Sequence, residues 1–587
     1  MSARFGPLLT GAGTTFRLWA PAAKSVALVR ERPIAMTADS RGWHTVAVAD
    51  ARAGTRYRFR IDGELNVPDP ASAFQPDDVD GPSEVIDHAT HRWQARDWRG
   101  RPWEEAVILE LHVGAFTPQG TFRAAIDKLD HVAAAGFTAI ELMPVADFAG
   151  RRNWGYDGVL LYAPDNAYGR PDDLRALVDA AHARGLMVFL DVVYNHFGPE
   201  GNYLGRYAPQ FFTAKATPWG RAIDYGVSEV RAFAIENALH WLRDYRFDGL
   251  RLDAVQAIAQ RGEPDFLEAL SRAIGAFATR TGRLIHLMLE NDDNSVRALD
   301  PRRTTPDGKY RAQWNDDYHH AWHVLLTGET QGYYCDHAAG PLGRIARVLA
   351  SGFDYQGEAS AHRDGRRRGE PSAGLAPTAF VNFLQNHDQI GNRALGERLD
   401  VLAERRALEA ALAVTLLAPM PPLMFMGEEW GATQPFPFFC DFTGALAEAV
   451  RKGRRQEFKA AYARFGDEIP DPLAEATFRS AVLDWEAPGR ADEAARLALV
   501  RDLLAVRRAR IVPLLAKIAF APDATRAAGN VVTAHWTHPS GQRLALLANL
   551  SGAAAARPEG GTDDDPIWGG PPPATLPPWS VFWSARS

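Results

Sequence analysis

Residues 247–254, Phe-Asp-Gly-Leu-Arg-Leu-Asp-Ala, place a cation and a carboxylate two positions apart in an apolar stretch. If the stretch is a strand, its period of two residues sends Arg251 and Asp253 to the same face. A guanidinium within reach of Asp253 would keep that carboxylate ionised and oriented, as a nucleophilic carboxylate requires near neutral pH. An ordinary buried ion pair would have the same pattern, so the neighbouring strands must distinguish the two interpretations.

Polar side chains also follow the other apolar runs of this part of the chain. They are His112, Asp191, Asn195, His196, Arg251, Asp253, Glu290, His387 and Asp388. A barrel of parallel strands needs apolar strand interiors, but it has no structural need for carboxylates at so many strand ends. The pattern therefore favours an active site over a set of structural ion pairs.

Three carboxylates from three strands suit retaining glycoside hydrolysis, in which one attacks, one transfers a proton and one orients the sugar. Asp253 would be the nucleophile. Glu290, which follows the apolar residues 287–289, would have the raised pKa of a general acid/base. Asp388 would bind sugar hydroxyls, and the neutral imidazoles of His196 and His387 would donate hydrogen bonds to them. A metal-dependent hydrolase is the competing interpretation, but the first strand ends without a His-x-His pair and no Glu-x-x-His helix stands out.

The elements that must position these residues alternate between strands and helices. The predicted strands are 107–113, 138–144, 186–190, 247–254, 284–290, 311–315, 380–388 and 422–427. Helical patterns lie between them; one spans 121–135, and another begins at Pro171 and stops at Gly185. About eight such units predict a (β/α)8 TIM barrel with its active site at the carboxyl ends of the strands. A doubly wound open sheet is the alternative, but residues 114–118 do not form the Gly-rich turn that it would normally carry.

Short alternating runs flank the predicted barrel on both sides. Residues 1–95 read as an N-terminal β-sandwich, in which Trp19, Trp43 and Tyr57 are predicted to be core residues rather than sugar platforms. After helices that reach residue 514, the segment 515–587 reads as a C-terminal β domain. The sequence thus predicts three domains: 1–95, 96–514 and 515–587.

The composition of the chain indicates which partners it is expected to have and in which cellular compartment it is expected to lie. The 587 residues carry 65 Lys+Arg against 72 Asp+Glu, a net charge of -7, with no long basic block, so nucleic acid is not an expected partner. Cys335 and Cys440 are far apart and in no metal-ligand spacing, which fits a reducing cytoplasm. No apolar run resembles a signal peptide or a membrane span. We expect a cytoplasmic protein without membrane contact, required metal or cofactor.

Four blocks resemble, in order, the four motifs of the α-amylase superfamily, glycoside hydrolase family 13. They are Asp-Val-Val-Tyr-Asn-His at 191–196, Gly-Leu-Arg-Leu-Asp-Ala at 249–254, Glu-Asn at 290–291 and Gln-Asn-His-Asp at 385–388. The resemblance implies that Asp253 is the nucleophile, Glu290 the acid/base and Asp388 the stabiliser of the transition state. It also implies that four further side chains surround the sugar at the cleavage point: Tyr156, His196, Arg251 and His387.

A narrower likeness runs over nearly the whole chain. Residues 152–158, 198–204, 217–220, 313–317 and 386–393 look like those of the maltooligosyltrehalose trehalohydrolases within that superfamily. The likeness implies hydrolysis of the α-1,4 bond next to the terminal trehalose of maltooligosyl trehalose. It also implies functional pairing with a maltooligosyl trehalose synthase. Trp219 would then be an aromatic platform near the leaving side, although a single Trp in a loop is as often a packing residue.

Two other functions stay open at this point. A 1,4-α-glucan branching enzyme would use the same three carboxylates but would pass the glucosyl intermediate to a sugar hydroxyl. A noncatalytic glucan-binding protein is disfavoured, because a binding module has no use for a proton donor in an apolar setting. Residues 291–294 differ from the context expected in other superfamily members, so the leaving-side contacts of these four residues are not assigned.

Overall fold

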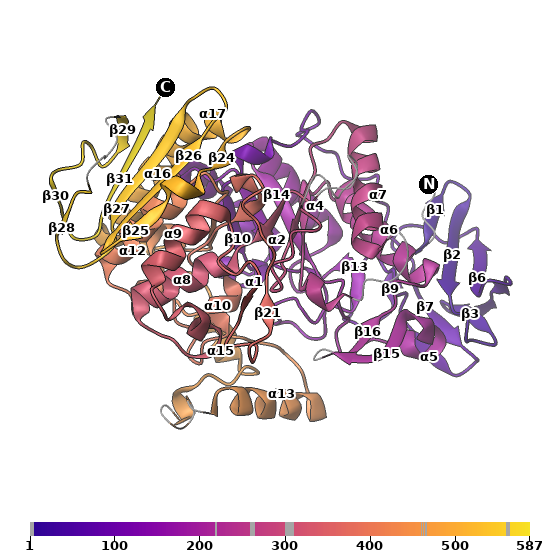
Figure 1. Cartoon of the computed structure of the whole chain (residues 1–587). Helices are drawn as coiled ribbons and strands as arrows, with labels where there is room; N and C mark the ends of the chain where they lie inside the picture. The colour runs from indigo at the N-terminus through magenta and orange to yellow at the C-terminus, as the bar shows by residue number, and fades with distance from the viewer. Residues whose placement is uncertain are drawn as a thin grey trace.

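A parallel sheet of eight strands lies at the centre of the computed structural model, which describes residues 5–217, 220–258, 265–299, 310–459, 461, 463, 466–558 and 564–586 (Figure 1). All eight strands predicted from the sequence are present. They are β10 (Ile108–Leu111), β11 (Ala139–Leu142), β14 (Met187–Val192), β17 (Gly249–Leu252), β18 (His286–Leu289), β19 (Ala312–Trp314), β22 (Phe380–Val381) and β23 (Leu423–Phe425).

The sheet closes into a barrel. Its strand order is β22-β19-β18-β17-β14-β11-β10-β23, so that each strand lies beside its predecessor in this set. A bridge between Asn382 and Pro422 joins the two outer strands, with the Asn382 N–H 3.0 Å from the Pro421 carbonyl and the Leu423 N–H 2.9 Å from the Asn382 carbonyl. The predicted TIM barrel is therefore confirmed, and the open doubly wound sheet is excluded.

Helices cover the outside of the barrel. The main ones are α4 (Pro171–Ala183), α6 (Ser228–Asp244), α7 (Phe266–Thr281), α8 (Asp316–Thr327), α9 (Pro341–Ser351), α12 (Arg405–Leu417) and α16 (Ala491–Val506). Pro171 is the first residue of α4, and the left-handed Gly185 follows its end, as predicted. The helical pattern at 121–135 forms two helices, α2 (Phe122–Ile126) and α3 (Leu129–Ala135), because the amides of Asp127 and Lys128 bond carbonyls three residues back.

The barrel interior has an apolar layer and a polar layer. Apolar side chains such as Met187, Phe189 and Met288 fill the lower part. One step further along the strands, on the same face, charged side chains replace them while remaining almost fully buried: Glu110, Glu141, Asp191 and Arg251. Because the step is toward the carboxyl ends of the strands, the charged layer lies at the predicted active site, to which Arg251 itself belongs.

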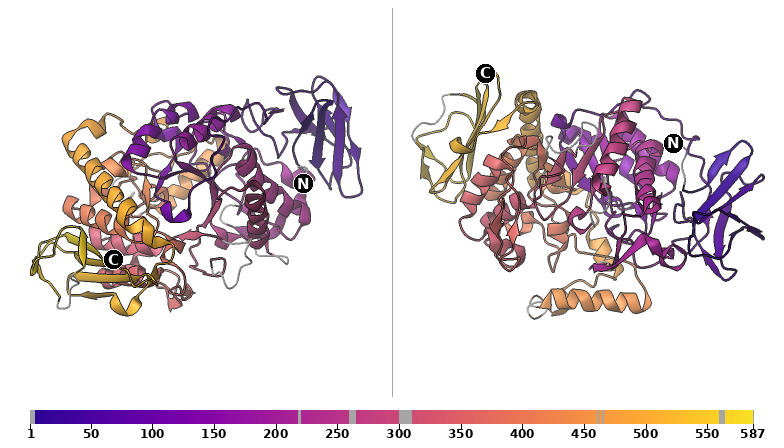
Figure 2. Two further views of the ribbon diagram at one scale, coloured as in Figure 1. Left: turned by 90° about the horizontal axis from the view of Figure 1, so that it is seen from above. Right: turned by 45° about the vertical axis from the view of Figure 1, so that its right-hand side comes forward.

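The N-terminal part is a sandwich of two antiparallel sheets (Figure 2). One has the order β1-β2-β6-β5 and the other β4-β3-β7-β8, with β9 also on β7. Trp19, Trp43 and Tyr57 are buried in its core, which confirms that prediction. The strands are β1 (Leu8–Thr10), β2 (Gly13–Trp19), β3 (Val26–Val29), β4 (Pro33–Ala35), β5 (Thr37–Ala38), β6 (Trp43–Val48), β7 (Arg56–Ile61), β8 (Leu65–Val67) and β9 (Ser83–Glu84).

The C-terminal sheet lies on the opposite side of the barrel from the sandwich (Figures 1 and 2). Its long strands are β26 (Val531–Thr537), β27 (Arg543–Asn549) and β31 (Ser580–Arg586), with β24 (Ala519–Phe520), β25 (Arg526–Ala528) and β29 (Asp565–Trp568) at the edges. The stacked rings of Trp536 and Trp583 face the barrel, and the Trp583 indole N–H lies 3.2 Å from the Ala413 carbonyl of α12. The exact domain boundaries near residues 95 and 515 stay a prediction.

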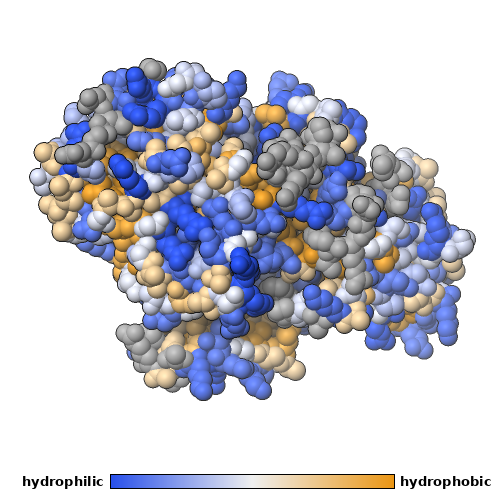
Figure 3. Space-filling model, in the orientation of Figure 1, coloured by the Kyte–Doolittle hydropathy of each residue, from blue (hydrophilic) through white to orange (hydrophobic). Residues whose placement is uncertain are grey.

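Hydrophilic residues dominate the face of the molecule shown in Figure 3, with smaller hydrophobic areas between them. Across the described ranges, we find no helix with the length and apolar character needed to cross a membrane.

Candidate active site

Arg251 joins carboxylates from three neighbouring strands. Its guanidinium is fully buried, and Nη1 lies 2.8 Å from Asp253 Oδ1 and 2.8 Å from Asp191 Oδ2. Nη2 lies 3.5 Å from Glu290 Oε2. Arg251 and Asp253 therefore share a face, as the strand period predicted. Burial raises the pKa of Asp191 to about 6, although the Arg251 guanidinium acts against the shift.

Both carboxylate oxygens of Asp253 accept hydrogen bonds from neighbouring side chains. Oδ1 accepts from Arg251, and Oδ2 accepts from the Asn195 side-chain amide at 2.7 Å. The Asp253 side chain is still 14% exposed, so it can meet a substrate. A charged donor on one oxygen and a neutral donor on the other fix the direction in which this carboxylate points.

Glu290 is positioned by the turn that follows Asp253. Ala254 has a φ of 41°, in the left-handed region, and its N–H donates to Glu290 Oε2 at 2.5 Å. Burial raises the pKa of Glu290 well above its usual value; the Arg251 guanidinium opposes the rise and the Asp253 carboxylate adds to it. The apolar run before Glu290 led us to expect this direction. A raised pKa favours the protonated form of the carboxyl group, which is the form that can donate a proton.

Asp388 is the most open of the three carboxylates. It lies in the short helix α10 (His387–Gly391), whose N-cap Asn386 accepts from the Asp388 N–H at 2.9 Å. Its side chain is 38% exposed, and its Oδ1 lies 3.5 Å from His387 Nε2. Asp388 can thus reach a sugar that also contacts the His387 region.

His387 differs from the prediction of a neutral imidazole. Its Nδ1 contacts Glu110 Oε1, and its backbone N–H donates to Glu110 Oε2 at 3.1 Å. Burial disfavours the charged ring, but the Glu110 and Asp388 carboxylates outweigh burial and raise the pKa of His387 to about 9. His387 is therefore an imidazolium near neutral pH. His196 follows the prediction, because burial lowers its pKa.

The loop that carries Tyr156 depends on a glycine. The Tyr156 hydroxyl donates to Asp191 Oδ2 at 2.6 Å and lies 2.8 Å from His387 Nε2, and the two rings are stacked. Gly155 before it has a φ of 106°, and a Cβ there would lie 2.1 Å from the Pro144 carbonyl oxygen. Only glycine fits this conformation and this close approach. His196 Nε2 lies 2.9 Å from the Tyr156 carbonyl and supports the same loop.

Seven of the eight predicted site residues gather at this end of the barrel: Asp253, Glu290, Asp388, Tyr156, His196, Arg251 and His387. Trp219 lies outside the described residues. Asp191 and Asn195 have no role predicted from the sequence, and Glu110 is not among the predicted site residues. An acid in the middle of a predicted buried strand, between Leu109 and Leu111, was the available signal for Glu110.

Two groups of side chains among the described residues have the geometry of metal ligands. In Asp317, His320 and His337, the Asp317 carboxylate already binds Arg368 Nη1 at 2.5 Å. In His88, His240 and Asp244, the Asp244 carboxylate binds Arg243 Nη2 at 2.6 Å. Because an arginine already neutralises each carboxylate, we assign no metal to either group. That the protein needs no metal and no cofactor stays a prediction.

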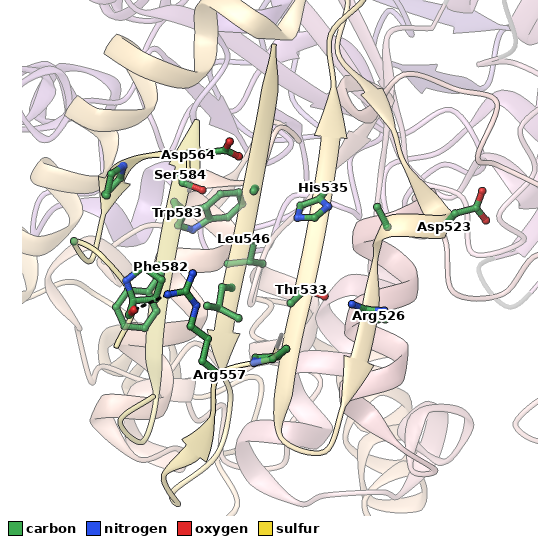
Figure 4. A pocket seen from close by; sticks show the side chains of 17 residues that line it. Asp523, Arg526, Thr533, His535, Leu546, Arg557, Asp564, Phe582, Trp583 and Ser584 are labelled. Carbon is green, nitrogen blue, oxygen red and sulfur yellow. Dashed lines mark hydrogen bonds between the residues drawn. The ribbon is translucent and has the colours of Figure 1, made fainter. Parts of the chain in front are cut away.

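A separate pocket of about 270 Å³ lies over the C-terminal sheet, between Thr533, His535 and Phe582 (Figure 4). Two of its charged side chains are already bound, since Asp564 pairs with Arg543 at 2.7 Å and Arg557 donates to the Pro572 carbonyl. None of the three catalytic candidates lines it, and we assign it no ligand.

Comparisons with known proteins agree with this geometry. The family model described as the alpha amylase catalytic domain matches residues 95–210, and carbohydrate-binding module 48, the isoamylase N-terminal domain, matches residues 4–73. The malto-oligosyltrehalose trehalohydrolase of Deinococcus radiodurans is 44% identical over 86% of this chain and 82% of its own length. That of Saccharolobus solfataricus is 41% identical over 82% of this chain and 84% of its own length.

The solved structures show the same similarity. A crystal structure of a candidate α-amylase from Salmonella typhimurium matches with a TM-score of 0.93 and 43% identity, over 100% of each chain. A pullulanase mutant from Paenibacillus barengoltzii, complexed with maltotetraose, matches with a TM-score of 0.74 and 21% identity over 100% of this chain and 95% of its own. The latter similarity extends to the fold alone.

Proposed function

The chain belongs to the malto-oligosyltrehalose trehalohydrolase family of α-amylase-type glycoside hydrolases, and we propose that it cleaves the α-1,4-glucosidic bond next to the terminal trehalose of maltooligosyl trehalose. The products are trehalose and a maltooligosaccharide. The main observation behind this proposal is that one guanidinium, that of Arg251, contacts both carboxyl groups needed for the reaction. These are the attacking carboxylate Asp253 and the acid Glu290.

Hydrolysis proceeds in two displacements with retention of configuration. Asp253 attacks the anomeric carbon while Glu290 gives its proton to the glucosidic oxygen, so that the C–O bond breaks and trehalose leaves. The Glu290 carboxylate then takes a proton from water as the water oxygen attacks the same carbon. The ester to Asp253 breaks, the maltooligosaccharide is released with the water oxygen on its anomeric carbon, and both carboxyl groups return to their starting forms.

The remaining side chains bind and orient the sugar at the cleavage point. Asp388, whose carboxylate is 38% exposed and lies 3.5 Å from His387 Nε2, stabilises the positive charge that develops on the ring in the transition state. Tyr156, His196, Arg251 and His387 surround that sugar. Trp219 as an aromatic platform on the leaving side stays a prediction from the sequence.

The proposed substrate indicates which enzyme must act before this one in the cell. An α-glucan that ends in trehalose must come from an enzyme that converts the terminal linkage of a maltooligosaccharide, so we propose functional pairing with a maltooligosyl trehalose synthase in trehalose biosynthesis. Cytoplasmic location, with no membrane or nucleic-acid partner, is supported by the net charge of -7 and by the two free cysteines.

Chromatographic product analysis tests the proposal, with maltopentaosyl trehalose and plain maltohexaose as separate substrates. Trehalose from the first and little cleavage of the second are expected. New branches without trehalose would instead identify a branching enzyme; the one from Nocardia farcinica is 33% identical over 42% of this chain and 36% of its own length. No reaction with either substrate would favour a noncatalytic glucan-binding protein.

A further inference from the structure

Glu110 lies behind the active site and contacts none of the three catalytic candidates. It is at the carboxyl end of β10, 1% exposed, and both of its carboxyl oxygens are directed at His387. Oε1 contacts the ring nitrogen Nδ1, and Oε2 accepts from the backbone N–H of the same residue. Two contacts from one carboxylate fix both the position of the His387 backbone and the rotation of its ring.

The hydrogen bonds beyond this pair determine where the protons lie. The single hydroxyl proton of Tyr156 points to Asp191 Oδ2, at 2.6 Å. The Tyr156 oxygen can then only accept from His387 Nε2, at 2.8 Å, so Nε2 must carry a proton. Nδ1 faces a carboxylate and carries one as well. The ring is therefore doubly protonated, and Glu110 is the buried anion that balances its charge.

We propose that Glu110 is a positioning residue for glycoside hydrolysis, holding His387 as a fixed imidazolium that in turn orders Tyr156 and Asp388 for the sugar. The inference rests on the proposed function for its substrate, but the contacts that carry it are independent of that substrate. Without the carboxylate, the ring would lose one proton, Nε2 or Nδ1 would become an acceptor, and the bond to Tyr156 would no longer be specified.

Other carboxyl and guanidinium groups among the described residues also interact electrostatically with His387. They are Asp388 in α10, Asp191 in β14, Arg251 in β17 and Glu141 in β11. The first three belong to the site itself. Glu141 is the partner of Glu110 in the β10–β11 register and is equally buried, yet neither of its oxygens has a hydrogen-bond partner among the described residues. Glu141 is therefore a matched control for the loss of a buried carboxylate at this depth.

The test compares Glu110→Gln with Glu141→Gln by steady-state kinetics of trehalose release between pH 5 and 10. We expect Glu110→Gln to lower kcat roughly 10- to 100-fold, as when the partner behind a metal-bound histidine is removed. The loss should be smallest at low pH and grow as pH rises, because His387 would titrate near the ordinary imidazole pKa of about 6.5 instead of about 9. Glu141→Gln should stay within about threefold of wild type with an unchanged pH profile.

A second readout does not depend on activity. The ¹³Cε1 resonance of His387, assigned by its absence in His387→Gln, should titrate near pH 9 in wild type and more than about one unit lower in Glu110→Gln. Failure of wild type to release trehalose would contradict the proposed function only. A His387 titration that is identical in wild type and Glu110→Gln would overturn the role of Glu110.

The double variant Glu110→Gln/His387→Gln covers the case in which Glu110→Gln alone does not fold. If Glu110 acts through His387, the double variant should have the activity of His387→Gln within about twofold, because sites acting through one another are not additive. A further loss of tenfold or more, or an equal loss in Glu141→Gln, would contradict the proposal.

Discussion

Glu290 combines a high pKa with a position 3.5 Å from a guanidinium. Replacing it with Gln keeps the size but removes the transferable proton. We expect kcat to fall by roughly 10²- to 10⁴-fold, the usual contribution of a general acid, with substrate binding retained because the hydrogen-bonding shape is kept. Rates of trehalose release and calorimetric titration with maltooligosyl trehalose measure the two effects separately.

The pH dependence follows from the same residue. Because the pKa of Glu290 lies above its usual value, the protonated acid persists to higher pH and kcat/KM should fall only as pH rises through that raised pKa. If wild-type kcat/KM already fell as the pH was raised from 4 to 5, the assignment of Glu290 as the acid would be contradicted. Full activity in Glu290→Gln would contradict it as well.

Glu141 makes a separate prediction about stability. Burial raises its pKa well above the usual value, and Asp191 and Glu110 add to the rise. The folded protein thus holds a proton that the unfolded chain releases near pH 4.5, so this residue stabilises least at high pH. Glu141→Gln should therefore gain stability relative to wild type as pH rises from about 5 to 9. Thermal unfolding at several pH values measures it, and a constant difference across that range would refute the prediction.

At the scale of elements, the loop 152–158 depends on Gly155. In Gly155→Ala the new methyl group would meet the Pro144 carbonyl oxygen in a conformation that disfavours alanine. The loop must shift, and Tyr156 with it, so we expect kcat/KM to fall by more than about tenfold while the barrel stays folded. Gly205→Ala is the matched control, because a Cβ there would meet nothing within 4 Å. Equal kinetics for the two variants would contradict this role of Gly155.

Sequence periodicity predicted the strands better than it predicted the contacts between them. Arg251 and Asp253 could be assigned to one face because they are two residues apart in one strand. Glu110 and His387 are 277 residues apart, and no local pattern relates them. The prediction that His387 is neutral was wrong for the same reason, because the charge of its ring depends on a carboxylate from another strand. The resemblance of motifs supplied Tyr156, which lies in a loop without periodicity.

At the scale of the whole molecule, the C-terminal sheet is attached to the barrel through Trp583. This ring is 1% exposed and stacks on Trp536. Trp583→Ala should lower the free energy of unfolding by about 3–5 kcal/mol, since a large buried ring is replaced by a cavity. Urea unfolding followed by fluorescence and by activity measures the loss.

Phe582→Ala is the control variant on the other face of the same strand. It should lower the free energy of unfolding by less than Trp583→Ala, because fewer core residues cover that face.

The seam of the barrel has a consequence for inactivation by heat. Between Phe380–Val381 and Leu423–Phe425, the described backbone is joined by the two hydrogen bonds of Asn382 and Leu423 alone, whereas β14 and β17 pair over four residues. Amide hydrogens at the seam should exchange with solvent faster than those of β17. Asp388 follows the seam by six residues, so opening there displaces a catalytic group first. On heating, activity should disappear several degrees before the circular dichroism of the helices changes.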